Sequence, residues 1–121
     1  MEEGLATGQD QVYASGHRER SIAGRKILFD ASGFLLNADD WSEELAEILA
    51  RENGMGPLDD SRWKVVHFLR DYYRRCGRPP SNHELKEGTG FSLMILESLF
   101  PGGVRGTARL LAGLPNPRTC L

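Results

Sequence analysis

The chain has 121 residues, enough for one domain with its own hydrophobic core and too few for two. Hydrophobic residues make up 40% and charged residues 26%, as in ordinary globular proteins, and no apolar run approaches the roughly 20 residues of a membrane-spanning helix. The formal net charge is −2, but the two halves of the chain differ. Residues 1–60 carry 13 acidic and 5 basic side chains, whereas residues 61–121 carry 4 acidic and 10 basic side chains. These values, with no signal-peptide pattern at the N-terminus, predict a single cytoplasmic domain.

The N-terminal third predicts a short β-hairpin after an irregular start. Residues 1–20 are polar and lack hydrophobic periodicity, so we expect them to be disordered. Residues 26–29 and 34–36 are the two predicted strands, and residues 30–33 between them fit a type I turn with Asp30 first and Gly33 fourth. Ala23-Gly24 is a further candidate turn. A hairpin of this size must pack on other elements to be stable.

From residue 37 the hydrophobic period becomes helical. We expect a first helix capped by Asp40 and ended by Asn53-Gly54, and a longer second helix from residue 59 or 60 to Cys76, ended by Gly77. Arginines of the second helix and the turn after it are expected on a solvated face or a docking surface; they are Arg70, Arg74, Arg75 and Arg78.

Three shorter helices are expected to follow. Ser81 and Glu84 form a predicted capping box for a helix that ends near residue 87. Residues 91–100 are almost wholly apolar, which indicates a core helix, and residues 104–112 form the last helix. A hairpin followed by helices indicates an α+β fold that is mostly α.

The last residues carry a thiol on a segment that reads LPNPRTCL. Pro115 and Pro117 lack backbone donors and favour extended geometry. The seven residues from Gly113 to Cys120 could span roughly 20–25 Å if extended. We therefore expect a folded domain at residues 21–113 followed by a flexible C-terminal arm, residues 114–121, which carries Cys120 into other proteins.

These features resemble the DsrC/TusE family, which comprises the gamma component of dissimilatory sulfite reductase and the TusE sulfur-relay protein. The similarity extends from about Ser21 to Leu121, and its most specific part is the closing motif with its penultimate cysteine. The matching pieces are Gly33-Phe34-Leu35, Asp39-Asp40-Trp41, Trp63, residues 68–73, Pro80, Leu85, residues 99–103, residues 112–117 and Cys120.

The resemblance implies an N-terminal β-hairpin packed on an orthogonal helical bundle, with a mobile arm whose penultimate cysteine carries sulfur as a persulfide. The DsrC branch has a second cysteine eleven residues earlier, where this chain has Arg109, so the single-thiol pattern is similar to TusE. The chain also departs from both branches by a shorter segment between Leu85 and Leu99 and by His83 in place of an arginine.

The predicted function is therefore a sulfur carrier rather than a self-sufficient enzyme. Cys120 is the predicted persulfide site, Arg118, Arg109 and Arg105 assist docking or polarisation, and Pro115 and Pro117 keep the arm extended. The implied partners are sulfur donors and acceptors: sulfurtransferases, sulfite reductase-like enzymes or tRNA-thiolation enzymes. Cys120 is expected to be a modest nucleophile alone, because Arg118 favours its thiolate while the carboxylate of Leu121 opposes it.

The main alternative is a nucleic-acid-binding regulator of sulfur metabolism. Residues 65–100 also fit a helix-turn-helix, and the basic half of the chain suits nucleic acid as well as an acidic protein surface. Against this interpretation, residues 92–100 lack the arginine, lysine, asparagine and glutamine side chains that usually read bases. Three histidines and two cysteines lack metal-ligand spacing, so we expect neither metal nor cofactor.

Overall fold

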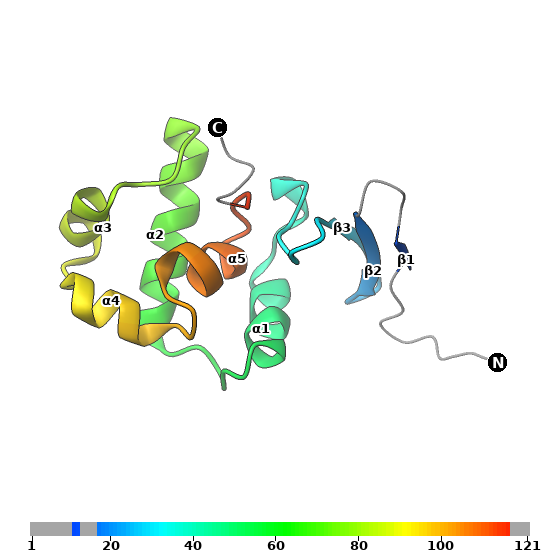
Figure 1. The fold of residues 1–121 in the computed structure, drawn as a ribbon, viewed down its shortest axis with the longest axis horizontal. Coiled ribbons are helices and arrows are strands. Elements are labelled where there is room, and N and C mark those ends of the chain that lie inside the picture. Colours follow the sequence, from blue (N-terminus) through cyan, green and yellow to red (C-terminus); the bar gives the residue numbers. More distant parts are fainter. Residues whose placement is uncertain (1–10, 13–16, 117–121) are drawn as a thin grey trace.

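The strands and the helices form two separate parts of the molecule (Figure 1). The structure is a computed structural model that describes residues 11–12 and 17–116. Strands β1 (Gln11–Val12), β2 (Arg18–Ile22) and β3 (Arg25–Phe29) form an antiparallel sheet in that order. The helices are η1 (Ala38–Asp40), α1 (Glu43–Glu52), α2 (Asp60–Cys76), α3 (Asn82–Thr89), α4 (Leu93–Leu99), η2 (Val104–Ala108) and α5 (Arg109–Leu111). This order confirms the predicted α+β fold, mostly α with a small hairpin.

The hairpin lies earlier in the chain than predicted. β2 pairs with β3 from Arg18 opposite Phe29 to Ile22 opposite Arg25, and Ala23-Gly24 forms the turn with φ angles of 53° and 79°. Two such positive angles match the twist of a tight antiparallel hairpin. The predicted strand at residues 34–36 is wrong, because only a single bridge joins Phe29 to Leu35. Residues 18–20, expected to be disordered, are part of β2 despite their polar side chains.

Local end signals place most helix boundaries. Asp59 caps α2, and Gly77 ends it in the left-handed region, both as expected. Asn53 ends α1, but its N-cap is Ser42, whose hydroxyl accepts a hydrogen bond from the Leu45 N–H at 3.0 Å. The predicted cap, Asp40, instead belongs to η1, because a 3₁₀ turn precedes the α-helix.

The core is built around α2, which crosses the helical part of the molecule (Figure 1). Its buried apolar side chains are Val65, Val66 and Leu69. Side chains from most other elements pack into the same cluster, including Ile27, Phe29, Leu45, Leu49, Leu85, Leu96 and Leu111. Burying one such side chain contributes about 1.5–3 kcal/mol, so this cluster holds the hairpin against the helices. Within the part of the chain described, no helix is long and apolar enough to span a membrane.

Helix α4 is not the core helix that its composition predicted. Leu96 is its only buried residue, while Leu93, Met94 and Ile95 are 36%, 82% and 47% exposed. In Figure 1, α4 lies at the periphery of the helical part. An unbroken apolar run indicates that a helix can be buried, but it does not show which face of the helix packs against the core.

Candidate functional site

The candidate site is built around the base of the C-terminal arm. Cys120, Arg118 and Pro117 lie outside the described residues, so their predicted roles stay predictions. The structure does describe residues 112–116, which lead to the thiol, and the side chains that hold them. Among those are two of the predicted site residues, Arg109 and Pro115.

The chain leaves α5 through a position that strongly favours glycine. Gly113 has a φ of +75°, and a Cβ there would meet Trp41 Cδ1 at 2.9 Å, Arg70 Nη1 at 3.1 Å and Leu35 Cδ2 at 3.2 Å. The left-handed backbone is strained for other residues, and the contacts leave little room for a side chain. After this turn, Leu114 is fully buried.

The side chain of Arg70, from α2, holds the end of α5. Its Nη1 donates to the Ala112 carbonyl at 3.2 Å and its Nη2 to the Ala38 carbonyl at 2.7 Å, and its guanidinium lies 4.5 Å from the Trp41 ring centroid. Burial, and then the charge of Arg74, lower the pKa of Arg70 from its ordinary value. The predicted solvated position of Arg70 is wrong, because the side chain is buried. Carbonyls at the end of a helix have no donor within the helix, and Arg70 supplies one to Ala112. Trp41 supplies another, as its Nε1 donates to Leu111 O at 2.7 Å.

Two further hydrogen bonds hold the first residues of the arm. Arg109, only 5% exposed, donates from Nη2 to the Pro115 carbonyl at 2.9 Å. Asn116, 7% exposed, donates from Nδ2 to Asp30 Oδ2 at 3.1 Å. The predicted turn forms at Asp30, whose other carboxylate oxygen accepts from the N–H groups of Ser32 and Phe34, each at 2.9 Å. Residues 114–116 are thus held by the domain.

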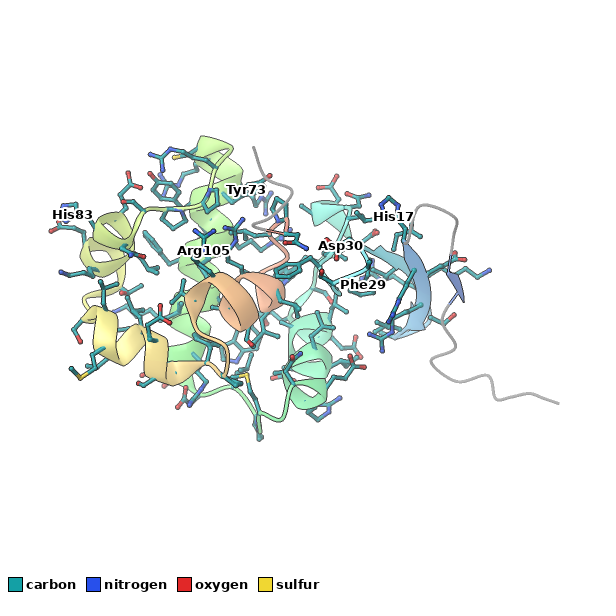
Figure 2. All side chains as sticks on the ribbon, viewed as in Figure 1. His17, Phe29, Asp30, Tyr73, His83 and Arg105 are labelled. Carbon is teal, nitrogen blue, oxygen red and sulfur yellow. The ribbon has the colours of Figure 1, made fainter. Side chains whose placement is uncertain are left out.

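This anchoring shortens the part of the arm that extends beyond the described contacts. Figure 2 shows Asp30 at the junction of the hairpin and the helices, so the arm is held where the two parts of the molecule meet. From Asn116 only four residues lead to Cys120, a span of at most about 14 Å.

A cavity of about 360 Å³ adjoins this anchor and is lined by three arginines, Arg78, Arg105 and Arg109. We call it the basic pocket. Arg105 projects from η2 (Figure 2) and is exposed, with no hydrogen bond or ion pair to any residue the structure describes. The structure thus brings together two of the predicted site residues, Arg105 and Arg109. It adds Arg78, which the sequence placed only on a solvated or docking face.

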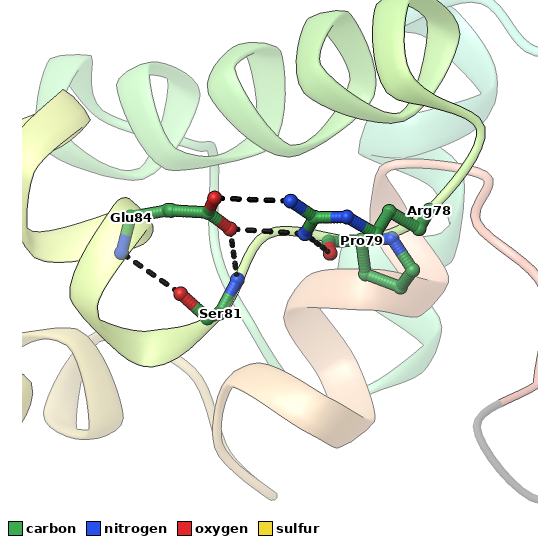
Figure 3. A network of polar contacts seen from close by, with 4 residues as sticks. All are labelled: Arg78, Pro79, Ser81 and Glu84. Atoms are coloured by element: carbon green, nitrogen blue, oxygen red, sulfur yellow. Dashed lines mark hydrogen bonds and ion pairs between the residues drawn. The ribbon is translucent and has the colours of Figure 1, made fainter.

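Arg78 differs from Arg105 because its charge is offset by a described carboxylate. Its Nη1 and Nη2 donate to the two carboxylate oxygens of Glu84, each at 3.0 Å, and Glu84 also accepts from the Ser81 N–H at 2.8 Å (Figure 3). The hydrogen bonds from Arg78, and then that from Ser81, hold the pKa of Glu84 well below its usual range. The Ser81 hydroxyl accepts from the Glu84 N–H at 3.1 Å, which confirms the predicted capping box.

The second thiol, Cys76, is exposed at the end of α2, the helix end that the sequence predicts. Among the residues described, no three His, Cys, Asp or Glu side chains are grouped so that they could hold a metal ion. The arrangement therefore offers cationic and hydrogen-bonding groups beside the base of a thiol-bearing arm.

Comparisons with known proteins agree with this arrangement. Residues 21–121 match the family described as DsrC like protein. The gamma subunit of dissimilatory-type sulfite reductase from Nitratidesulfovibrio vulgaris is 36% identical, over 85% of this chain and 98% of that protein. The sulfurtransferase TusE of Yersinia pseudotuberculosis is 39% identical, over 81% and 96%. The solution structure of the DsrC/gamma subunit of dissimilatory sulfite reductase from Pyrobaculum aerophilum matches with a TM-score of 0.73 and 37% identity, over 91% and 98%. The chain therefore belongs to the DsrC family.

Proposed function

We propose that this protein is a cytoplasmic sulfur carrier that accepts and passes on persulfide sulfur through Cys120. The observation that carries the proposal is the position of the thiol, four residues beyond an anchor at Asn116. The names of the relatives, a sulfite reductase gamma subunit and sulfurtransferases, support the same role. In this proposal the domain fixes where the arm begins, and the partner enzymes supply the sulfur chemistry.

The transfer is an exchange between thiols. The Cys120 thiolate attacks the outer sulfur of a donor persulfide, a new S–S bond forms, and the donor leaves as a thiolate. Delivery is the same step with roles reversed: an acceptor thiolate takes the outer sulfur and Cys120 leaves as a thiolate. No external oxidant or reductant is consumed, because each S–S bond that breaks is replaced by another.

The arginines near the arm would assist at both steps. Arg105 is exposed on the basic pocket, and its charge can attract an acidic partner surface or an anionic sulfur species. Arg109 is turned inward and holds Pro115, so its proposed contribution is to position the arm. Arg118 and Pro117 keep their predicted parts, favouring the thiolate and an extended chain.

Arg109 also limits the chemistry. It occupies the place where the DsrC branch resembled by this chain has a second cysteine. Two-thiol trisulfide chemistry would therefore need Cys76 as the second thiol, and in this proposal the carrier uses Cys120 alone. The partners are sulfurtransferases together with sulfite reductase-like or tRNA-thiolation enzymes.

Mass spectrometry of the intact protein tests the proposal directly. After incubation with glutathione persulfide and removal of excess reagent, we expect the mass of one additional sulfur atom on the terminal peptide. Cys120→Ser should abolish this addition, whereas Cys76→Ser, the matched control with an exposed thiol elsewhere, should retain it. Sulfur that persists on Cys120→Ser would overturn the assignment of the site.

The regulator alternative gains no support from the exposed surface of α4. The order of α3 and α4 does allow a helix-turn-helix, but the exposed side chains of α4 include Leu93, Met94 and Ile95. These apolar groups cannot make the paired hydrogen bonds by which side chains distinguish bases. Sequence-selective binding to duplex DNA at physiological salt would nevertheless favour the regulator.

A further inference from the structure

Asp30 has one more side-chain oxygen than its turn requires. Its Oδ1 accepts from the N–H groups of both Ser32 and Phe34. Asparagine and serine begin such turns as well as aspartate does, because each offers one side-chain oxygen to the same backbone donors. The turn therefore accounts for Oδ1 alone. The second oxygen, Oδ2, accepts instead from Nδ2 of Asn116, a residue 86 positions further along the chain.

The surroundings of Asp30 hold that second oxygen in place. The Asp30 N–H donates to the Phe34 carbonyl at 2.8 Å, and the Asp30 carbonyl accepts from the Gly33 N–H at 3.0 Å. With the two bonds to Oδ1, four hydrogen bonds thus hold this residue at the end of β3. Phe29, which precedes it, is buried in the core. A side chain locked in this way by packing and hydrogen bonds can hold its partner in one geometry.

The two successive residues Pro115 and Asn116 are held by different parts of the molecule. The Pro115 carbonyl accepts from Arg109, which belongs to the helical part, whereas Asn116 bonds to Asp30, at the end of the hairpin. Figure 2 shows Asp30 where these two parts meet. One contact fixes a point of a chain, and a second contact on the next residue restricts the direction in which the chain continues.

We propose that Asp30 is a positioning residue for sulfur transfer: through its bond to Asn116, it sets the direction in which the chain continues towards Cys120. The hairpin thereby takes part in sulfur transfer, although Asp30 lies 90 positions before the thiol. The inference rests on the proposed function, because this direction matters only if Cys120 is the thiol that exchanges sulfur. Asp30 does not touch the sulfur in this proposal, so it directs the thiol without changing its reactivity.

Pulsed electron paramagnetic resonance between the two native thiols tests the direction of the arm. Nitroxide labels on Cys76, exposed at the end of α2, and on Cys120 report a distribution of distances in the full chain. Asp30→Ser keeps one oxygen for the turn and removes the one that Asn116 uses. We expect the distribution to widen about 1.1- to 1.3-fold, the ratio for a flexible tether that lengthens from four residues to between five and seven. Asp60→Ser, the matched loss of an exposed aspartate on α2, should leave the width unchanged.

A second variant isolates the contact from the turn. Asn116→Ala leaves Asp30 and its turn bonds in place, and it should widen the distribution by a similar factor. The double variant should widen it no further than either single variant, because both changes remove the same contact. Hydrogen exchange of the Phe34 amide should be as slow in Asp30→Ser as in wild type, which would show that the turn remains. If that protection is lost, Asn116→Ala alone decides.

A second measurement separates direction from reactivity. In a Cys76→Ser background, Cys120 should react with the disulfide reagent DTNB at the same rate with and without Asp30→Ser, because a small reagent reaches the thiol from any direction. An unchanged distance distribution in Asn116→Ala, or additive widening in the double variant, would overturn the inference. A changed DTNB rate with an unchanged distribution would assign to Asp30 an electrostatic effect on the thiol instead.

These measurements involve no persulfide, so they are independent of the test of the carrier proposal. Failure of sulfur loading on Cys120 would leave the measured direction of the arm intact. An arm that Asp30 does not direct would, conversely, leave Cys120 as the proposed site of loading.

Discussion

The arm base at residues 112–116 and helix α4 use their side chains in opposite ways. At the arm base, polar groups are buried and hydrogen-bonded: Arg70 and Asn116 pair with groups far along the chain, and Arg109 donates to the carbonyl of Pro115. In α4, three consecutive apolar side chains face solvent. Buried polar pairs have one geometry in which every donor and acceptor is satisfied, whereas apolar contacts tolerate several arrangements. The difference indicates that the fold specifies the start of the arm more tightly than the position of α4.

The largest expected effect comes from Gly113→Ala. The left-handed backbone costs a residue with a Cβ about 1–3 kcal/mol, and crowding by Trp41 and Leu35 adds a similar amount. Gly54→Ala is the control, because Gly54 has a φ of +81° and a Cβ added there would have nothing within 4 Å. Urea denaturation of both variants should give a clearly larger loss of unfolding free energy for Gly113→Ala. Equal losses would show that the close packing at the arm base contributes nothing.

Arg70→Met should be next in size. It removes the side-chain donor of the buried Ala112 carbonyl, and a buried group left unpaired costs about 1–3 kcal/mol. The Ala38 carbonyl loses one of two donors, since it also accepts from the Trp41 N–H. Arg74→Met, an exposed change on the same helix, should alter the unfolding free energy by less than about 0.5 kcal/mol. If the two variants lost the same stability, the arm base would not depend on the buried guanidinium.

Glu84→Gln tests whether a polar contact away from the arm base needs burial to matter. The pKa of Glu84 lies below its ordinary value of 4.5, so its ion pair with Arg78 stabilises the fold above that pH. As the pH falls below 4.5, the unfolded chain takes up the proton first and the contribution shrinks, and it is lost once the pH passes the lowered pKa of the folded carboxylate. At pH 7 we therefore expect a higher melting temperature for wild type than for Glu84→Gln, and a difference smaller than the one that Arg70→Met produces. In acid we expect the melting temperatures of wild type and Glu84→Gln to converge. A difference independent of pH would assign the effect to the shape of the side chain.

Met94→Ser should have the smallest effect. Its side chain is 82% exposed, so the unfolding free energy should change by less than about 0.5 kcal/mol. Leu96→Ala, two residues along the same helix and fully buried, should cost about 2–5 kcal/mol. A large loss on Met94→Ser in denaturant titration would mean that the apolar face of α4 is covered in solution.

The parts of this fold that the sequence predicts correctly depend on neighbouring residues. Asp59, Gly77 and the Ser81–Glu84 box act within a few positions, so the pattern alone places the ends of α2 and the start of α3. Two adjacent turn signals, Ala23-Gly24 and Asp30 to Gly33, both form, and which one joins paired strands depends on long-range packing.

The candidate site shows the same limit. Nothing near Arg70 in sequence indicates that its partners are carbonyls 32 and 42 residues away, and the bond from Asn116 to Asp30 joins positions 86 apart. The proximity of Arg105 and Arg109 follows from the sequence, because the two residues are one helical turn apart. The contribution of Arg78 to the same pocket comes from the tertiary fold.

The bond between Asn116 and Asp30 has a consequence for the kinetics of sulfur exchange. A terminus that began at Gly113 would distribute its sulfur over a sphere set by seven residues, whereas one held at Asn116 is confined to a sphere set by four. Volume grows with the cube of the radius, so the effective molarity of the nucleophile inside the smaller sphere is about fivefold higher. Partners whose reactive cysteine lies within that sphere gain an encounter advantage, and those with a more deeply recessed one are excluded by distance alone.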